Sequence, residues 1–504
     1  MLLTLGPGLG SYLLLCVLGW FVFKKIQQSL SDRAFARKHN CGKAPHLPTY
    51  LFGFDTLFEL LKSYTQNKST ELVRSWHHRL GRTFTVHFGK GVVVQTCEPK
   101  NVQAVLATQF HDFDLGDRKE SYRPLLGEGI FAVDGKVWEH SRALLRPNFV
   151  RNQISDIAVY ERHVLQLFKH IPSDGSTVDL QDLFLRMTLD SATEFLFGHS
   201  VDTLGSESLS TTNSFAENFK VSLAGTLVRV LLGPLRVFYR SRAYNKATEE
   251  SRKYVGQFVR GALEHRAAQK AGHLDQNQSQ GYVFLYELVQ QTQDEKVLTD
   301  QLLSVLLAGR DTTAILLTIT FFIMSKREDV WRKLRAEVLN LEGKRPSFED
   351  LKNMKYLTWV MNETLRLYPI VPINIRTANK NTTLPTGGGP DGKAPVFIAK
   401  GQEVMYSSYT MHRLPDVYGN DATEYRPERW ANLRPGWAYI PFNGGPRICI
   451  AQQFALTEAG YTIVRILQEY ESIESRDPEP LKARVGLTLA SANGAKVALT
   501  PVRG

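Results

Sequence analysis

The hydrophobic pattern of the chain begins with a long uncharged stretch. Residues 2–23 carry no charge, and Lys24 and Lys25 follow at once. At about 1.5 Å per residue, a helix of this length crosses a hydrocarbon core of about 30 Å. The pattern predicts a membrane anchor and basic stop segment within residues 1–40, with everything after it in the cytosol by the positive-inside rule. A cleaved secretory signal is the alternative, although no small-x-small site precedes Lys24.

Most of the remaining chain has helical periodicity, with one strong strand signal. Residues 83–96, TFTVHFGKGVVVQT, alternate and are rich in β-branched residues on both sides of a GKG turn, which predicts a β-hairpin. The polar residues 204–213 and 271–281 are typical of surface connections between helices. The helical periodicity and the single hairpin predict a mainly α fold with small β-sheets. No repeat or low-complexity linker divides residues 41–504.

One predicted helix is apolar nearly all round. Residues 299–326, TDQLLSVLLAGRDTTAILLTITFFIMSK, begin with a cap at Thr299 and an acidic first turn. Such a helix is buried through the middle of a domain, or it spans a membrane, and the charges near its centre disfavour the second interpretation. Asp311 and Thr312 interrupt the apolar run, so we expect a chemical role for them, with a helix kink as the alternative. The sequence predicts no role for Arg310.

Composition and charge narrow the candidate partners. With 43% hydrophobic and 22% charged residues, the chain has the composition of a globular protein. The net charge of +11 favours anionic neighbours. No RNP, helix-turn-helix or zinc-finger pattern is present, so we expect no nucleic acid. Membrane lipid or an acidic protein fits better, and solvated lysines without a partner are the remaining alternative. Four cysteines without CxxC spacing argue against a disulfide framework or a zinc site.

One cysteine has an unusual setting. FNGGPRICIA, residues 442–451, places Cys449 after a glycine-rich loop and before an apolar helical pattern. A thiolate is a strong, soft metal ligand, and a helix N-terminus lowers the pKa of a thiol. The glycines let the backbone approach a flat ligand closely, and Arg447 can meet an anionic group on that ligand. These features suit a thiolate in the axial position of haem.

Two further stretches predict an ion-pair network. Glu363 and Arg366, in LTWVMNETLRLYP, are three residues apart and share a helix face. EYRPERW, which precedes the cysteine loop, supplies Arg429 as a second guanidinium. A carboxylate shared by two arginines favours a network over an isolated surface pair, which contributes little.

These stretches, in this order, resemble the signature motifs of the cytochrome P-450 family. FNGGPRICIA is similar to the haem-thiolate loop Phe-x-x-Gly-x-Arg-x-Cys-x-Gly, with Ala451 in place of the final glycine. AGRDTT, ETLR and RPERW fall where the family has its oxygen-activating helix, its Glu-x-x-Arg helix and its meander. The resemblance covers the chain after the anchor. It implies the cytochrome P-450 fold, with residues 41–504 as a single haem domain.

The resemblance also implies roles for individual residues. Cys449 is implied as the ligand of the iron of haem b, with Phe442 shielding its sulfur. The residues implied at the haem propionates are Arg447, Trp138, Arg142 and Arg376. Ordinary helix packing is the alternative for Trp138 and Arg142, and an ordinary ion pair is the alternative for Arg376. Asp311 and Thr312 are implied to organise waters that deliver protons, and Glu363, Arg366 and Arg429 to hold the scaffold behind the haem.

The function implied is that of a monooxygenase anchored in the endoplasmic reticulum membrane, which inserts one oxygen atom into an apolar substrate. Electrons come from a separate NADPH–cytochrome P-450 reductase, because the sequence after Cys449 is too short for a flavin domain, and cytochrome b5 is a second expected donor. Residues 371–401 and 411–430 resemble most the fungal branch that hydroxylates n-alkanes and fatty acids. The alternatives are an oxygenase that tailors a terpene or polyketide, a haem-thiolate isomerase or dehydratase, and a non-catalytic haem-binding protein.

The apolar residues nearest these motifs predict the substrate. The expected lining contains no carboxylate or histidine that could bind a polar end of the substrate. We therefore expect the substrate to be a long apolar chain that binds mainly through burial of its surface. The residues expected to line the haem face are Leu303, Leu306, Leu307, Ala308, Ile370, Val371, Leu487 and Leu489.

Overall fold

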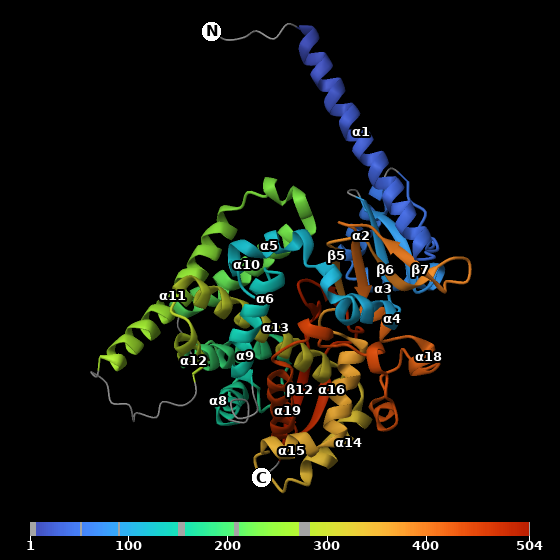
Figure 1. Ribbon diagram of the computed structural model, residues 1–504. Coiled ribbons are helices and arrows are strands. Elements are labelled where there is room, and N and C mark those ends of the chain that lie inside the picture. Colours follow the sequence, from blue (N-terminus) through green and yellow to red (C-terminus); the bar gives the residue numbers. More distant parts are fainter. Residues whose placement is uncertain are drawn as a thin grey trace.

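The structure is a computed structural model, and it describes residues 7–50, 53–88, 91–149, 157–205, 211–271 and 283–502. The polar connections predicted at residues 204–213 and 271–281 fall largely outside these ranges. The fold is mainly helical with small sheets, as predicted (Figure 1).

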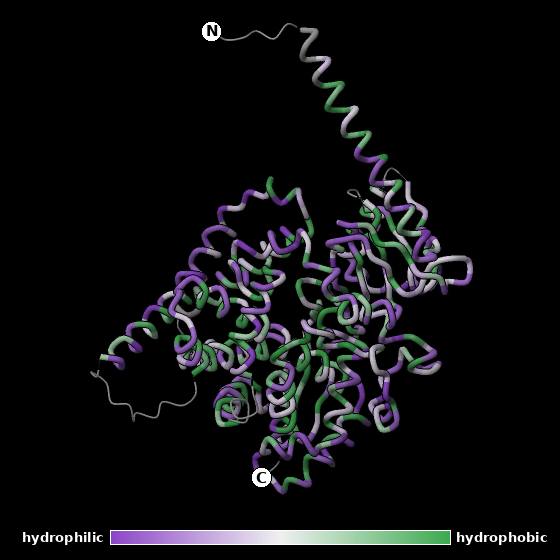
Figure 2. Tube along the Cα trace, viewed as in Figure 1, coloured by the Kyte–Doolittle hydropathy of each residue, from purple (hydrophilic) through white to green (hydrophobic). Residues whose placement is uncertain are grey.

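Helix α1 (Pro7–Lys38) projects from the body of the molecule (Figure 1). Its exposed apolar residues include Tyr12, Trp20, Phe23 and Ile26, and hydrophobic positions recur along it in Figure 2. Its C-terminal half contacts the hairpin of β6 (Thr382–Gly388) and β7 (Ala394–Ile398). Asn381 donates to the Asp32 carboxylate at 2.8 Å, and the Phe35 and Phe397 rings lie 5.6 Å apart. The chain leaving the helix then bonds to the same hairpin at Gly42, where a Cβ would lie 2.2 Å from the Gly389 nitrogen. Glycine is therefore required for this close contact.

The body is mostly helical and contains several small sheets. Its helices are α2 (Phe54–Thr65), α3 (Ser69–Leu80), α4 (Pro99–Gln103), α5 (Lys119–Leu126), α6 (Gly135–Leu145), α8 (Ile157–Phe168), α9 (Leu180–Phe197), α10 (Thr211–Leu232), α11 (Arg242–Lys270), α12 (Phe284–Gln291), α13 (Glu295–Lys326), α14 (Glu328–Leu339), α15 (Phe348–Asn353), α16 (Lys355–Leu367), α17 (Ser408–Met411), α18 (Pro415–Tyr418) and α19 (Gln452–Glu469). The shorter 3-10 turns include η6 (Gly233–Phe238), η7 (Pro427–Ala431) and η9 (Gly445–Arg447).

The largest sheet has the strand order β1-β2-β8-β5-β3. Strands β1 (Thr83–Phe88) and β2 (Gly91–Thr96) pair antiparallel from Thr83↔Thr96 to Phe88↔Gly91, which confirms the predicted hairpin. The other strands are β3 (Phe113–Asp114), β4 (Val178–Asp179), β5 (Ile373–Ala378), β8 (Glu403–Ser407), β9 (Tyr470–Ser475), β10 (Ala483–Val485), β11 (Leu489–Ser491) and β12 (Lys496–Pro501).

Helix α13 runs through the main hydrophobic core, where it packs on α9, α16 and α19. Two helical segments of the described chain are long and apolar enough to cross a membrane, Phe215–Phe238 and Glu295–Lys326. The second is α13, and 61% of its most apolar window is buried, so it is a core helix, as predicted. The predicted cap at Thr299 is wrong. The helix begins at Glu295, because the Asp294 side chain accepts from the first backbone N–H groups, and Thr299 lies buried inside the helix.

Candidate active site

Helix α13 is buried on both sides of residues 307–312, which include most of the AGRDTT stretch, but not within them. Residues 298–304 and 313–322 are buried, whereas residues 307–312 keep part of their surface accessible. A Cβ at Gly309 would meet only Ala192 of α9, at 3.8 Å, so this turn has no tightly packed neighbour. The helix therefore presents its polar interruption to accessible space inside an apolar core, and this space is the candidate active site.

The glycine loop fixes the backbone of the cysteine. The N–H of Cys449 donates to the carbonyl of Phe442 at 3.0 Å. Gly445 has a φ of 66°, and a Cβ there would lie 1.8 Å from the carbonyl oxygen of Leu106, so only glycine fits. Ala451, which departs from the family pattern, has a φ of −96°, a value that does not require glycine.

The side chain of Cys449 is exposed, yet the protein atoms around it raise its pKa by desolvation. The backbone N–H of Ala451 and the guanidinium of Arg142 act in the opposite direction. The sequence predicted a lowered pKa from a helix start at Cys449. Helix α19 begins only at Gln452, so desolvation has the larger effect on the thiol of the protein alone. A coordinated metal ion deprotonates a thiol directly.

Three buried guanidiniums gather beside this loop. Arg447 donates to Asp134 at 2.8 Å. Burial lowers the pKa of Arg447 to about 10. Attraction to Asp134 opposes this shift, and repulsion from Arg376 and Arg118 increases it. Arg376, on β5, is buried and donates to the Asn374 side chain and the Ile375 carbonyl.

Arg118 immediately precedes α5, and the sequence analysis did not identify it. Burial lowers the pKa of Arg118, with repulsion from Arg376 as a further cause. One of its nitrogens donates to Asn374 at 2.6 Å, but its buried Nε has no hydrogen-bond partner. Among the described residues, Asp134 is the one carboxylate that forms an ion pair with this cluster. Buried cations need compensating charge, so a ligand with two carboxylates, such as haem b with its propionates, fits these residues.

Trp138 lies between two of the predicted arginines. It is buried on α6, with the Arg447 guanidinium 4.4 Å and the Arg142 guanidinium 5.9 Å from its ring centre. Arg142 also donates to the carbonyl of Ile448 at 2.9 Å, beside the cysteine. Phe442 is half-buried against the main core. The structure therefore brings α6 and the cysteine loop together, although they are far apart in the sequence.

Glu363, Arg366 and Arg429 form a buried network. Glu363 accepts from Nε and Nη2 of Arg366, from Nε of Arg429 and, unpredicted, from the indole of Trp430, at 2.8 to 3.0 Å. Its side chain and that of Arg366 are fully buried, and that of Arg429 is 3% exposed. Arg366 donates further to the carbonyls of His412, Ala422 and Glu424. The network joins α16 to the segment that carries η7.

The polar residues of α13 interact with one another and with neighbouring helices. Arg310 forms an ion pair with Asp311 at 3.2 Å, and the hydroxyl of Thr312 donates to the Ala308 carbonyl at 2.8 Å. Burial raises the pKa of Asp311, and the Arg310 charge opposes that shift. Asp311 therefore holds a proton at a higher pH than an exposed aspartate does.

A second acid, Glu458 of α19, lies beside α13 and was missed in the sequence. It is 3% exposed, and burial raises its pKa to about 7, while the hydroxyls of Ser191 and Thr313 lower it. Its position four residues before Thr462 in an apolar helix gave no signal for a chemical role. Only the fold places it next to Thr313.

The predicted lining residues divide into two groups. Leu303, Leu306 and Leu489 have no accessible surface, so their prediction as lining residues is wrong: they fill the core. Ile370 is also buried. The residues that keep accessible surface are Leu307, Ala308, Val371 and Leu487. Helical periodicity does not explain the split, because Leu303, Leu306 and Leu307 are spaced to share one face of α13; burial changes along the helix instead, toward the accessible turn at residues 307–312.

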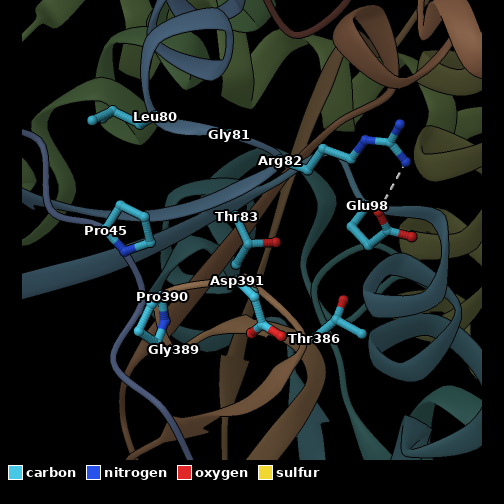
Figure 3. Close-up of a pocket in the computed structure, with 12 residues that line it drawn as sticks. Pro45, Leu80, Gly81, Arg82, Thr83, Glu98, Thr386, Gly389, Pro390 and Asp391 are labelled. Atoms are coloured by element: carbon cyan, nitrogen blue, oxygen red, sulfur yellow. Dashed lines mark hydrogen bonds and ion pairs between the residues drawn. The ribbon is translucent and has the colours of Figure 1, made fainter.

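A surface cleft of about 350 Å³ lies elsewhere, between the end of α3, Pro45 and the turn after β6 (Figure 3). Its charged groups are largely paired, since Arg82 binds Glu98 at 3.1 Å and Asp416 at 2.6 Å. None of its lining residues belongs to the cysteine loop, the arginine cluster or α13. It is not the candidate active site.

Comparisons with known proteins agree with this geometry. Residues 45–495 match the family model described as Cytochrome P450. The chain is 46% identical to cytochrome P450 monooxygenase himC of Aspergillus japonicus, over 89% of this chain and 81% of the relative. It is 42% identical to cytochrome P450 52A13 of Debaryomyces hansenii, over 94% and 95%, and 46% identical to cytochrome P450 52A1 of Candida tropicalis, over 80% and 78%.

The family match covers most of the chain and includes the cysteine loop, the buried arginines and the accessible turn of α13. The chain belongs to the cytochrome P450 family and is a haem-thiolate monooxygenase that takes its electrons from a reductase.

Proposed function

We propose that this chain hydroxylates a long apolar chain, an n-alkane or a fatty acid, at or near one end. The observation that carries the proposal is the accessible turn of α13, where residues 307–312 place Leu307 and Ala308 beside Asp311 and Thr312. An apolar substrate can bury surface against the first pair while the second pair handles protons.

Cys449 would hold the iron of haem b, and Arg118, Arg376 and Arg447 would meet its propionates. When bound, haem with a thiolate ligand supplies the activation of molecular oxygen. Trp138 and Arg142 would position the loop, because Trp138 packs against Arg447 and Arg142 bonds to the carbonyl next to Cys449. Phe442 would shield the sulfur from water.

Asp311 and Thr312 would deliver protons. Because the pKa of Asp311 is raised, its carboxyl stays protonated to a higher pH than that of an exposed aspartate, which suits a general acid. The Thr312 hydroxyl, one residue along the same accessible turn, can pass a proton between that carboxyl and the substrate side. Glu363, Arg366 and Arg429 would act only on the scaffold, since all three are buried away from this turn.

The substrate class rests on the resemblance to the fungal alkane and fatty-acid branch and on the apolar accessible residues. A second candidate is an oxygenase that tailors a terpene or polyketide. It stands because Leu307 and Ala308, the apolar residues of the accessible turn, can bury a bulky apolar ring system as well as an alkyl chain.

We further propose that residues 1–40 anchor the protein in the endoplasmic reticulum membrane and that residues 41–504 form one cytosolic haem domain. In Figure 1, α2 and the segment after α10 lie on the side of the body from which α1 projects. Both expose large apolar side chains, including Phe54, Phe58, Leu235 and Phe238, which are 61 to 77% exposed. Such a patch fits a bilayer surface beside the anchor. Cytochrome b5 is proposed as a second electron donor.

The test is product analysis with reductase and NADPH. Dodecane and dodecanoic acid should each shift the haem spectrum and give terminal or near-terminal alcohols. If neither is oxidised while a polycyclic terpene is, the second candidate replaces the first.

A further inference from the structure

A cleft of about 380 Å³ lies where η6 meets α5. It is separate from the cysteine loop and from the accessible turn of α13. Its lining residues are Glu120, Arg229, Arg236, Val237, Tyr239 and Arg240.

The positive charge of this cleft is only partly balanced. Arg236 binds the Asp117 carboxylate with two nitrogens, at 2.6 and 2.8 Å, and the carboxylate of Glu120 binds Arg123 at 3.0 Å. Arg229 donates instead to the backbone carbonyls of Ser121 and Glu120, at 3.4 and 3.1 Å.

Arg240 is exposed at the edge of the cleft. Across the ranges that the structure describes, no carboxylate forms an ion pair with Arg240 or Arg229. Two guanidiniums therefore remain whose charge no described carboxylate compensates.

An apolar rim adjoins these arginines. Leu231, Leu235, Val237 and Phe238 are 57 to 77% exposed. They end the apolar segment Phe215–Phe238, whose most apolar stretch is only 22% buried. Guanidiniums beside exposed apolar side chains match the boundary of a bilayer, where charged heads stay at the headgroups and apolar groups enter the hydrocarbon.

We propose that this cleft binds the phosphate headgroup of an anionic phospholipid, with the rim at residues 231–238 in the hydrocarbon. The proposal rests on the membrane attachment proposed above. Guanidiniums bind phosphate through paired N–H groups, and an anionic lipid brings a net charge that a zwitterionic one lacks. A fatty-acid carboxylate shares that charge. The structure favours the phospholipid because the apolar rim lies on the outer surface, where a bilayer covers it.

Occupation of the cleft links the membrane to the active-site side of α5. The Ser121 hydroxyl donates to the Arg229 carbonyl at 3.1 Å, so α5 and the end of α10 are already joined there. Arg118, of the buried arginine cluster, immediately precedes α5. A headgroup bound by Arg229 would hold these two elements together.

Native mass spectrometry of the full-length protein in detergent tests the proposal. Dioleoyl phosphatidylserine, dioleoyl phosphatidylcholine and dodecanoic acid are the probes. We expect phosphatidylserine to be retained well above phosphatidylcholine, and the double variant R229Q/R240Q to lower its apparent affinity roughly tenfold or more. The matched control is Arg332→Gln on α14, whose side chain is 72% exposed and distant from α1 in Figure 1; it should change nothing. The Soret spectrum of each variant reports folding.

Equal retention of the two phospholipids, or an unchanged phosphatidylserine affinity in R229Q/R240Q, overturns the proposal. Retention of dodecanoic acid alone, lost in the double variant, also overturns it and makes the cleft a carboxylate site. These outcomes are distinct from failure of the anchor. The anchor proposal fails if the wild-type protein is washed from membranes by alkaline carbonate, whatever its lipid preference.

Discussion

Replacing Glu363 with glutamine should destabilise the fold more than any surface charge change. The glutamine keeps the shape of the side chain but removes the negative charge that Arg366 and Arg429 share. It also turns one acceptor oxygen into an NH2 group that faces guanidinium or indole donors.

The magnitude follows from burial. Glu363 and Arg366 are fully buried and the Arg429 side chain is 3% exposed, so water cannot compensate the two cations. Removing one partner of a buried ion pair costs about 3–5 kcal/mol. At about 1.4 kcal/mol per tenfold, the ratio of folded to unfolded protein should fall by roughly two to three and a half orders of magnitude. This is a large part of a typical unfolding free energy of about 5–15 kcal/mol.

Urea unfolding followed by circular dichroism measures the change, and the haem content of the purified protein provides a second readout. Glu328→Gln is the matched control, because Glu328 pairs with Arg332 at 3.5 Å with both side chains at least 72% exposed. The control should leave the unfolding midpoint unchanged. If Glu363→Gln unfolds at the wild-type midpoint with normal haem content, the reasoning about the network is refuted.

Three further predictions concern the active site and its neighbours. Thr312→Ala should keep haem bound but uncouple the reaction, so NADPH consumption continues while hydrogen peroxide replaces product; unchanged coupling contradicts the proton-delivery role. Arg118→Met should lower the haem-to-protein ratio several-fold, whereas Arg123→Met, on the exposed side of α5, should not. For Glu458 the folded pKa is raised to about 7, so its contribution to stability is present at acidic pH and is lost as the pH rises through about 7. Glu458→Gln should flatten that decline in the urea midpoint between about pH 5 and about pH 8, and an unaltered slope would contradict the shift.

The sequence predicted best those features that are local. The hairpin at residues 83–96 and the buried helix α13 follow from periodicity, and the cysteine loop is a contiguous motif. The predicted start of α13 at Thr299 was wrong, because Asp294, which lies before the apolar run, caps the helix instead. Only the conformation of the turn reveals which of two plausible caps is used.

Features that depend on remote contacts were not predictable. Arg118 became a candidate only when the fold placed it beside Arg376 with its Nε unpaired. Trp430 was missed for the same reason: it directly follows the predicted Arg429, but nothing in the sequence indicates that its indole donates to Glu363. Leu306 is buried and Leu307 keeps accessible surface, a difference that the sequence of two adjacent leucines does not indicate.

The central claim is that Cys449 is the axial ligand of the haem, and one spectrum tests it directly. In the wild-type protein, the reduced carbonyl complex should have a strongly red-shifted Soret band, because a thiolate donates electron density to the iron. Cys449→Ser should lose that band, while Cys97→Ser, at a buried cysteine outside the loop, should keep it. A Cys449→Ser protein that retains the red-shifted band contradicts the account.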